Sequence, residues 1–277
     1  MRKRLVATAF AAHAVLFARS ASADKPFVDR SQTLPSLHLS ADAGLGFGQY
    51  QAVTLDPSGK TTSAVKVGWG SNFEAAVGLP FLGELGVRLG YRFGDGGPLA
   101  GGGLGADHFA RLFDPVVNEP GLDSMANPEL HLRGNLVDLE VFELGLETRA
   151  VIPTAANSDF ALTPGVPVRF HVPTLARIDT GLWFPIQTNA DTSYSIDIPA
   201  QLFFQVDDAF FGPLSGVRFN HPGGDRPSST DVPVGIGGGY TLGGFADLKV
   251  QVRTERINDA SWSKFIGGGI GVGIRIP

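Results

Sequence analysis

Apolar and polar residues alternate along most of this chain with a period of two residues. In "ADLKVQVRTER" (246–256), the side chains of Leu248, Val250 and Val252 fall on one face of an extended strand, and charged or amide side chains occupy the other face. The pattern persists for many residues in several segments, whereas an average strand of a soluble domain has about five or six. A tilted strand needs about 9–11 residues to cross the hydrocarbon layer of a bilayer. The alternation therefore predicts membrane-crossing strands whose apolar face meets lipid.

The alternating segments are numerous enough to close into a barrel. Closure is required because lipid offers no hydrogen-bond partner to the free edge of a sheet. We predict an all-β fold, a closed antiparallel up-and-down transmembrane β-barrel of about 12 strands, an even number that returns the C-terminus to the periplasm. The predicted strands are 37–48, 63–79, 84–93, 129–136, 139–152, 161–172, 177–187, 194–206, 214–219, 231–242, 246–256 and 264–276.

The region 129–152 leaves ten strands as an alternative. Its alternation changes parity near Leu139, and no glycine or proline marks a turn between Leu136 and Leu139. Such a change fits a hairpin between two strands, and it also fits a bulge within one long strand.

Connector lengths differ between the two ends of the predicted barrel. Tight turns are expected on one side, at 80–84, 173–176 and 242–245. Longer loops are expected on the other side, at 49–62, 94–128 and 220–231. Short periplasmic turns and long outer loops are typical of bacterial barrels, and the longest loop, 94–128, is a candidate gate of the pore.

The N-terminus has the three parts of a secretory signal peptide. Arg2, Lys3 and Arg4 precede an apolar run, and "ASA" at 21–23 forms a small-residue cleavage site. The expected organisation is a signal peptide over 1–23, a periplasmic N-terminal segment over 24–36, and an outer-membrane β-barrel over 37–277 with a long outer loop at 94–128.

Composition supports an exported β-protein without covalent cross-links. The chain has 37 glycines and 19 prolines, too many for a helical protein, while 43% of its residues are hydrophobic. The absence of cysteine excludes disulfides, thiolate chemistry and lipid-modified cysteine. Loss of residues 1–23 would remove four basic residues and no acidic one, so the net charge would fall from −5 to −9. An acidic chain without a basic stripe argues against nucleic acid as a partner.

Polar side chains on the second face of these strands are expected to line an enclosed lumen. Their signs are mixed, so they can bind polar solutes in a narrow pore or pair with one another and hold the barrel rigid, and both interpretations stay open. Barrels of about eight strands are filled by side chains and those of about 16–18 are open, so we expect a narrow or gated pore. The candidate lumen-lining or solute-binding residues are Lys66, Glu74, Arg88, Arg92, Glu143, Glu147, Arg149, Arg169, Arg177, Asp179, Asp197, Gln201, Gln205, Asp247, Lys249, Gln251, Arg253, Glu255 and Arg275.

The chain resembles the outer-membrane β-barrel proteins of Gram-negative bacteria. "FEAAVGLPFLGELGVRLGYRF" (73–93) is similar to the strand–turn–strand units of the MetA-pathway phenol-degradation transporter family, as are 144–155 and 181–188 in style. The resemblance implies insertion by the barrel-assembly machinery and the transport of hydrophobic or aromatic solutes. Barrels of this kind usually finish on an aromatic residue, whereas this chain has Ile276 followed by Pro277.

These features predict a porin-like monomer in the cell outer membrane, surrounded by lipid and lipopolysaccharide. We expect it to act as a passive channel or uptake port for small solutes. A structural or adhesive surface barrel with a blocked lumen is the alternative, and liposome swelling separates the two because a blocked barrel gives no flux. A secreted soluble β-sandwich is the third interpretation.

No catalytic, cofactor or metal site is expected. The glycine-rich stretch 235–244 lies within alternating strands, with no helix following it, unlike a phosphate-binding loop. His38, His131 and His171 fall on predicted lumen faces, but no serine is placed as a nucleophile beside them. The acidic residues of loop 94–128 lack the spacing of a calcium-binding loop.

Overall fold

The computed structural model describes the chain from residue 25 onward, with several gaps. The described ranges are 25–55, 61–80, 83–93, 124–125, 127–154, 160–188, 192–225 and 227–277, with the backbone alone at 50–55, 61–66, 92–93, 124 and 264–265. Within these ranges, no helix has both the length and the apolar character needed to span a membrane.

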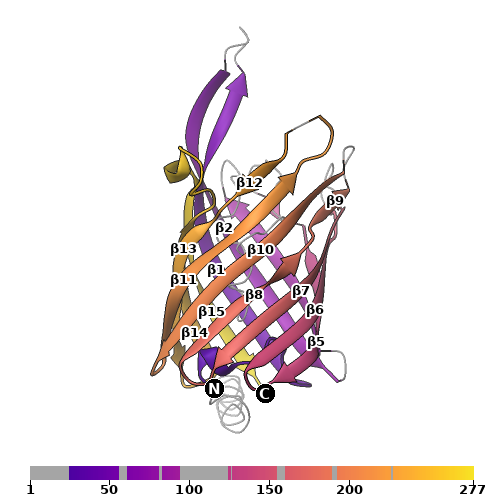
Figure 1. Ribbon diagram of the computed structural model, residues 1–277, viewed down its shortest axis with the longest axis vertical. Helices are drawn as coiled ribbons and strands as arrows, with labels where there is room; N and C mark the ends of the chain where they lie inside the picture. The colour runs from indigo at the N-terminus through magenta and orange to yellow at the C-terminus, as the bar shows by residue number, and fades with distance from the viewer. Residues whose placement is uncertain are drawn as a thin grey trace, which may run out of the picture.

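Twelve antiparallel strands form one closed barrel (Figure 1). Nine crossings are continuous strands: β1 (Leu39–Leu55), β2 (Thr61–Leu79), β3 (Gly83–Phe93), β6 (Phe142–Val151), β7 (Phe160–Val172), β10 (Ser193–Val206), β11 (Ala209–His221), β14 (Ala246–Thr254) and β15 (Ile266–Ile276). Three crossings consist of two pieces: β4 (Ser124–Met125) with β5 (Glu129–Leu139), β8 (Ala176–Trp183) with β9 (Ile186–Thr188), and β12 (Ser229–Asp231) with β13 (Val234–Leu242). Within the described residues, the 3₁₀ helices η1 (Phe27–Asp29) and η4 (Trp262–Phe265) precede β1 and β15.

The barrel closes between its first and last strands. β1 pairs with β2 on one side and with β15 on the other, where Leu39 lies opposite Ile276. The main strands therefore have hydrogen-bonded neighbours on both sides, as a sheet surrounded by lipid requires. The prediction of a closed twelve-stranded barrel is confirmed, and the alternative of a soluble β-sandwich is wrong.

Region 129–152 contains both a hairpin and a bulge, the two alternatives that its sequence left open. β5 and β6 are separate strands that reverse direction at residues 140–141, and a bulge interrupts their pairing between Asn135 and Val137. The bulge adds one unpaired residue, which reverses the facing of the residues beyond it and produces the change of parity. The ten-strand alternative is wrong.

Two predicted boundaries were also wrong. Residues 49–62 are mostly strand: β1 and β2 stay paired as far as Leu55 opposite Thr61, although the pairing of β1 with β15 stops at Gly48. The resulting hairpin projects beyond the other strands (Figure 1). β11 begins at Ala209, five residues before its predicted start, because its early part contains Gly212 and Pro213, which hide the alternation.

The two faces of the wall differ in the way that the alternation predicts. On β14, the apolar side chains of Leu248, Val250 and Val252 are 46–50% exposed, while those of Lys249 and Gln251 on the inner face are 3% exposed. Exposed large apolar side chains recur on the outer face of every long strand. This partition gives the wall an apolar belt toward lipid and a polar interior.

Short turns, residue 25 at the start of the described chain, and the C-terminus lie together at one end of the barrel, which we call the turn end (Figure 1). The connections after β5, β7, β10 and β13 are all short, and β15 finishes beside the start of β1. Among the described residues, the longer connections at 222–225, 227–228 and 255–265 lie at the opposite end, the loop end. This is the asymmetry expected from the sequence, and the turn end corresponds to the predicted periplasmic side.

We expect Val250→Arg to lower the free energy of unfolding from bilayers by about 2–4 kcal/mol, because Val250 is the middle residue of β14 and faces outward. The measurement is a urea titration of the barrel in lipid vesicles. Asp225→Arg, at an exposed site of the loop end, is the matched control. Equal, small losses for both variants would contradict a lipid-facing position for Val250.

Candidate functional site: the barrel interior

Most of the predicted lumen residues are buried inside the barrel. Glu255 and Arg275 are partly exposed, and the side chains of Lys66 and Arg92 lie outside the described part of the chain. Contact of these residues with a solute stays a prediction. Fifteen are buried: Glu74, Arg88, Glu143, Glu147, Arg149, Arg169, Arg177, Asp179, Asp197, Gln201, Gln205, Asp247, Lys249, Gln251 and Arg253.

Four further charged side chains of the strands, Asp42, Glu84, Glu129 and Arg133, are buried in the same interior. The sequence analysis did not select them, although each has the parity of inward-facing residues on its own strand. Alternation alone was therefore a sufficient signal for these four. Of the three histidines placed on lumen faces, His131 and His171 are buried, and His38 is partly exposed.

Glu147 on β6 lies at the centre of a buried ionic cluster. Its carboxylate accepts hydrogen bonds from Arg133 (3.0 Å), from Arg149 (2.9 and 3.1 Å) and from the indole nitrogen of Trp183 (3.1 Å). These donors come from three different strands, β5, β6 and β8. A carboxylate with four such contacts compensates the buried arginine charges and ties the strands together.

Ion pairs of the same kind recur along the interior. They include Lys249–Asp42 (2.9 Å), Arg218–Asp197 (3.0 Å), Arg253–Glu255 (2.6 Å), Arg177–Asp179 (3.0 Å) and Arg88–Glu129 (3.5 Å). The mixed signs seen in the sequence are thus arranged as compensating pairs. This arrangement favours the rigid-barrel interpretation for most of these charges.

Trp183 lies flat against two glycines of the inner wall. A Cβ atom at Gly165 would come within 2.1 Å of the indole, and one at Gly181 within 2.7 Å. The guanidinium of Arg149 lies 5.7 Å from the ring centroid. Glycines in the lumen therefore make room for inward rings here.

Residues 25–36, which we call the N-terminal segment, lie inside the turn end of the barrel. Phe27 and Val28 are 0% exposed, and Arg30, Gln32 and Leu34 are also buried. The sequence analysis placed this segment in the periplasm and gave no indication that it enters the barrel. Its side chains and backbone contact strands around the inner wall, so the segment fills this end of the interior.

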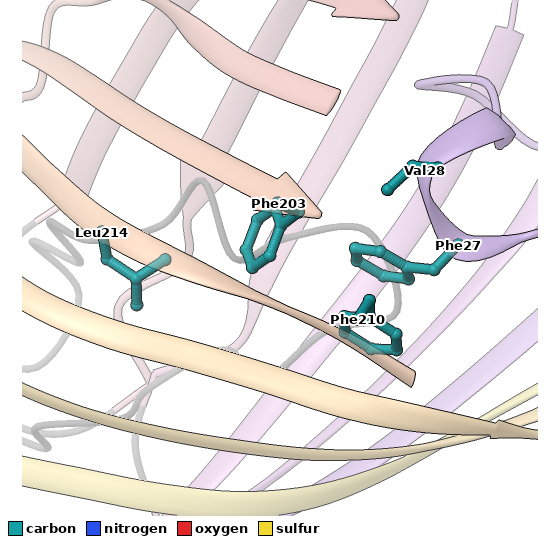
Figure 2. Packing of buried hydrophobic residues seen from close by; sticks show 5 residues of the cluster. All are labelled: Phe27, Val28, Phe203, Phe210 and Leu214. Carbon is teal, nitrogen blue, oxygen red and sulfur yellow. The ribbon is translucent and has the colours of Figure 1, made fainter. Parts of the chain in front are cut away.

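An aromatic cluster anchors the start of the N-terminal segment (Figure 2). The ring of Phe27 stacks on Phe210 with centroids 3.7 Å apart, and it meets the edge of Phe203 at 5.5 Å. The guanidinium of Arg177 lies over the same ring at 4.0 Å from its centroid. Val28 and Leu214 complete the cluster.

The wall residues of this cluster break the alternation of the sequence. Phe203 and Phe210 face inward, while their neighbours Phe204 and Phe211 face outward and are exposed. Two adjacent phenylalanines in each of two consecutive strands were the available signal for an apolar patch on the inner wall. The alternation indicated a polar residue at those inward positions.

Charged and polar wall residues bind the backbone of the N-terminal segment. Four of its carbonyl oxygens accept hydrogen bonds: Phe27 from Arg177 (2.8 Å), Val28 from His171 (2.6 Å), Arg30 from Arg169 (2.8 Å) and Gln32 from Arg133 (2.9 Å). Three of its amides donate: Val28 to Gln205 (3.4 Å), Gln32 to Glu143 (2.7 Å) and Leu34 to Glu84 (3.1 Å). Several predicted lumen residues thus satisfy an internal polypeptide backbone, which is their role in this conformation.

Side chains of the N-terminal segment add further polar contacts with the wall. Arg30 forms an ion pair with Asp247 on β14. Asp29 accepts a hydrogen bond of 2.8 Å from the amide of Thr174, in the turn between β7 and β8. Thr174 has a φ of 60°, which is unfavourable for a β-branched residue, and the contact with Asp29 supports this turn.

The described residues contain no group of three histidines or carboxylates placed to hold a metal ion. Of loop 94–128, only residues 124–125 and 127–128 are described. Its acidic residues lie outside the described residues, and the gating role predicted for the loop stays a prediction.

Several solved transmembrane barrels have a similar fold. An outer membrane channel from Pseudomonas putida F1 has a TM-score of 0.63 at 10% identity, covering 90% of this chain and 100% of that chain. The NanC porin has a TM-score of 0.52 at 4% identity, covering 86% of this chain and 99% of that chain. The KdgM porin in complex with disordered oligogalacturonate has a TM-score of 0.50 at 10% identity, covering 85% and 98%.

At these identities the likeness concerns the fold, which is that of outer-membrane barrels. No protein-family model matches the chain, and no curated protein matches its sequence. The resemblance to the MetA-pathway family therefore stays a prediction.

We expect Glu147→Ala to lower the free energy of unfolding by about 3–5 kcal/mol, because it leaves buried arginine side chains without their carboxylate. Denaturant titration followed by heat-modifiable gel migration measures the loss. Glu140→Ala, in the exposed turn after β5, is the control and should change stability by less than about 0.5 kcal/mol. A loss as small as that of the control would show that the cluster does not hold the strands together.

Proposed function

We propose that this protein is a monomeric passive channel or uptake port of the outer membrane, and that its solutes are small and hydrophobic or aromatic. The apolar belt supports a position in lipid, with lipopolysaccharide as a neighbour on the loop side. Insertion would depend on the barrel-assembly machinery. The N-terminal segment, which fills the turn end, would be the movable part of the pathway.

The observation that carries this proposal is the way in which the N-terminal segment is held. Between Lys25 and Ser36, its contacts with the wall are side-chain packing and hydrogen bonds that involve at least one side chain. Backbone pairing with the wall begins only at Leu37, whose amide donates to the carbonyl of Gly78 at 2.8 Å. A segment held without strand pairing can leave while every strand of the barrel keeps its neighbours.

The aromatic cluster supports an aromatic or hydrophobic class of solute. Phe203, Phe210 and Leu214 form an apolar patch on an inner wall that is otherwise rich in charged and amide side chains. Phe27 occupies the patch in this conformation, stacked on one ring and against the edge of another. When the segment leaves, the patch offers the same contacts to a planar solute. The resemblance of residues 73–93 to transporters for phenol degradation favours the same class.

A structural or adhesive barrel with a blocked lumen is the second candidate. The compensated charges and the filled turn end favour a closed interior. The hairpin of β1 and β2 favours a role at the surface, because it extends past the pairing of β1 with β15, which stops at Gly48, and past the pairing of β2 with β3, which stops at Trp69.

We expect deletion of residues 25–34 to raise the rate of solute entry into proteoliposomes several-fold, because it removes the segment that fills the turn end. Liposome swelling with a series of sugars and of small aromatic alcohols measures the rate. Lys25→Ala, at an exposed residue of the same segment, is the control and should leave the rate unchanged. If neither the full chain nor the deletion variant gives flux, the channel is refuted and the blocked barrel is supported.

A further inference from the structure

His171, near the end of β7, has an acceptor facing each of its two ring nitrogens. Nδ1 lies 2.6 Å from the carbonyl oxygen of Val28 in the N-terminal segment, and Nε2 lies 2.7 Å from a carboxylate oxygen of Glu143 on β6. The imidazole is buried. A neutral imidazole carries one N–H and can donate only one hydrogen bond.

Both short contacts therefore require one proton more than a neutral histidine and an ionised glutamate possess together. The proton is on His171 if the ring is an imidazolium, or on Glu143 if that carboxyl donates to Nε2. The number of bound protons is the same in both cases. With neither group protonated, a lone pair of Nε2 faces a carboxylate oxygen at 2.7 Å, which is repulsive.

The same carboxylate also holds the N-terminal segment directly. Its second oxygen accepts hydrogen bonds from the amide of Gln32 (2.7 Å) and from the hydroxyl of Ser31 (2.9 Å). His171 and Glu143 thus form hydrogen bonds with the segment at Val28 and at 31–32, on both sides of Arg30. The extra proton lies between Nε2 of His171 and the carboxylate of Glu143, and so connects the two residues that hold the segment.

The carboxylates around His171 and Glu143 outnumber the arginines by one, so a positive charge on His171 is compensated. Arg169 on β7 binds Asp179 on β8, and Arg177 on β8 binds the same aspartate. Asp29 in the segment binds the backbone of Thr174, and Asp138, opposite Glu143 on β5, is exposed to solvent. Arg30 of the segment pairs with Asp247, and Arg133 pairs with Glu147. The remaining carboxylates beside His171 are Asp29, Glu143 and Asp179, and they face Arg169, Arg177 and a protonated His171.

We propose that His171 and Glu143 form a proton-binding site that latches the N-terminal segment inside the barrel. The ligand of the site is a single proton, and the latched state binds it more tightly than the released state, in which both side chains meet water. The inference rests on the proposed function only in taking the segment as movable. Raising the pH removes the proton and with it one of the short contacts, so the segment is held on the acidic side and released on the alkaline side.

Pulsed EPR distances report the position of the segment directly. The chain has no cysteine, so nitroxide labels can be placed uniquely at Lys25→Cys and Glu140→Cys, both exposed at the turn end. We expect one narrow distance distribution at about pH 5.5 and a broad second population at about pH 9.5, because the alkaline sample removes the shared proton. The ratio of released to held segment should rise roughly tenfold or more, the equivalent of one hydrogen bond to a charged group.

Glu143→Gln separates the latch from a general effect of pH. The introduced amide can donate to Nε2 of a neutral imidazole and still accept from Gln32, so no extra proton is needed. We expect this variant to keep the narrow distribution from neutral to alkaline pH. His221→Gln, at an exposed histidine of the loop end, should respond to pH as the unmodified chain does. Heat-modifiable gel migration verifies that every variant folds.

The proposal is overturned if the distances of the unmodified chain do not change with pH, or if Glu143→Gln shows the same alkaline release. Loss of the response in His221→Gln would also overturn it. The readout does not depend on conduction: a barrel without flux can still release its segment, and a conducting barrel can hold it at every pH. Failure of the latch and failure of the channel are therefore distinct results.

Discussion

The structure depends on the need to satisfy every backbone amide and carbonyl of a sheet that is surrounded by lipid. The pairing of β1 with β15 meets this need, because it removes the two free edges that an open twelve-stranded sheet would otherwise expose. Closure then creates two environments on the two faces of one wall. The outer face has to be apolar along its whole height, and the inner face becomes an enclosed space in which charges lose much of their contact with water.

That enclosed space explains why the interior charges are arranged as they are. A buried arginine or carboxylate is costly unless a partner compensates it, and the interior meets this condition across strands, as at Glu147 with Arg133 and Arg149. The N-terminal segment compensates further buried charges of the wall. Its backbone supplies acceptors to wall cations and donors to wall carboxylates, so one short stretch of chain satisfies wall residues from many strands.

The contacts of that segment also make its position conditional. Strand pairing would fix it as permanently as the wall, whereas aromatic packing, ion pairs and side-chain hydrogen bonds respond to solutes and to protons. In the proposed function another flat apolar group replaces Phe27, and the contact between His171 and Glu143 needs a proton. The proposed passive pathway with a removable segment at the turn end, and the proposed proton that holds the segment, rest on the same set of contacts.

The sequence by itself determined the barrel, because a period of two over long segments follows directly from strand geometry and from the two solvents that the wall separates. It placed Leu248 outside and Lys249 inside, and it gave twelve strands, leaving open only whether 129–152 forms a hairpin or a bulge. It could not show that 25–36 enters the lumen, because this segment has no periodicity and its partners are distant in sequence. Tertiary structure alone decided which interior charges pair, where Phe203 meets Phe27, and which histidine meets two acceptors, since those contacts depend on register, tilt and closure.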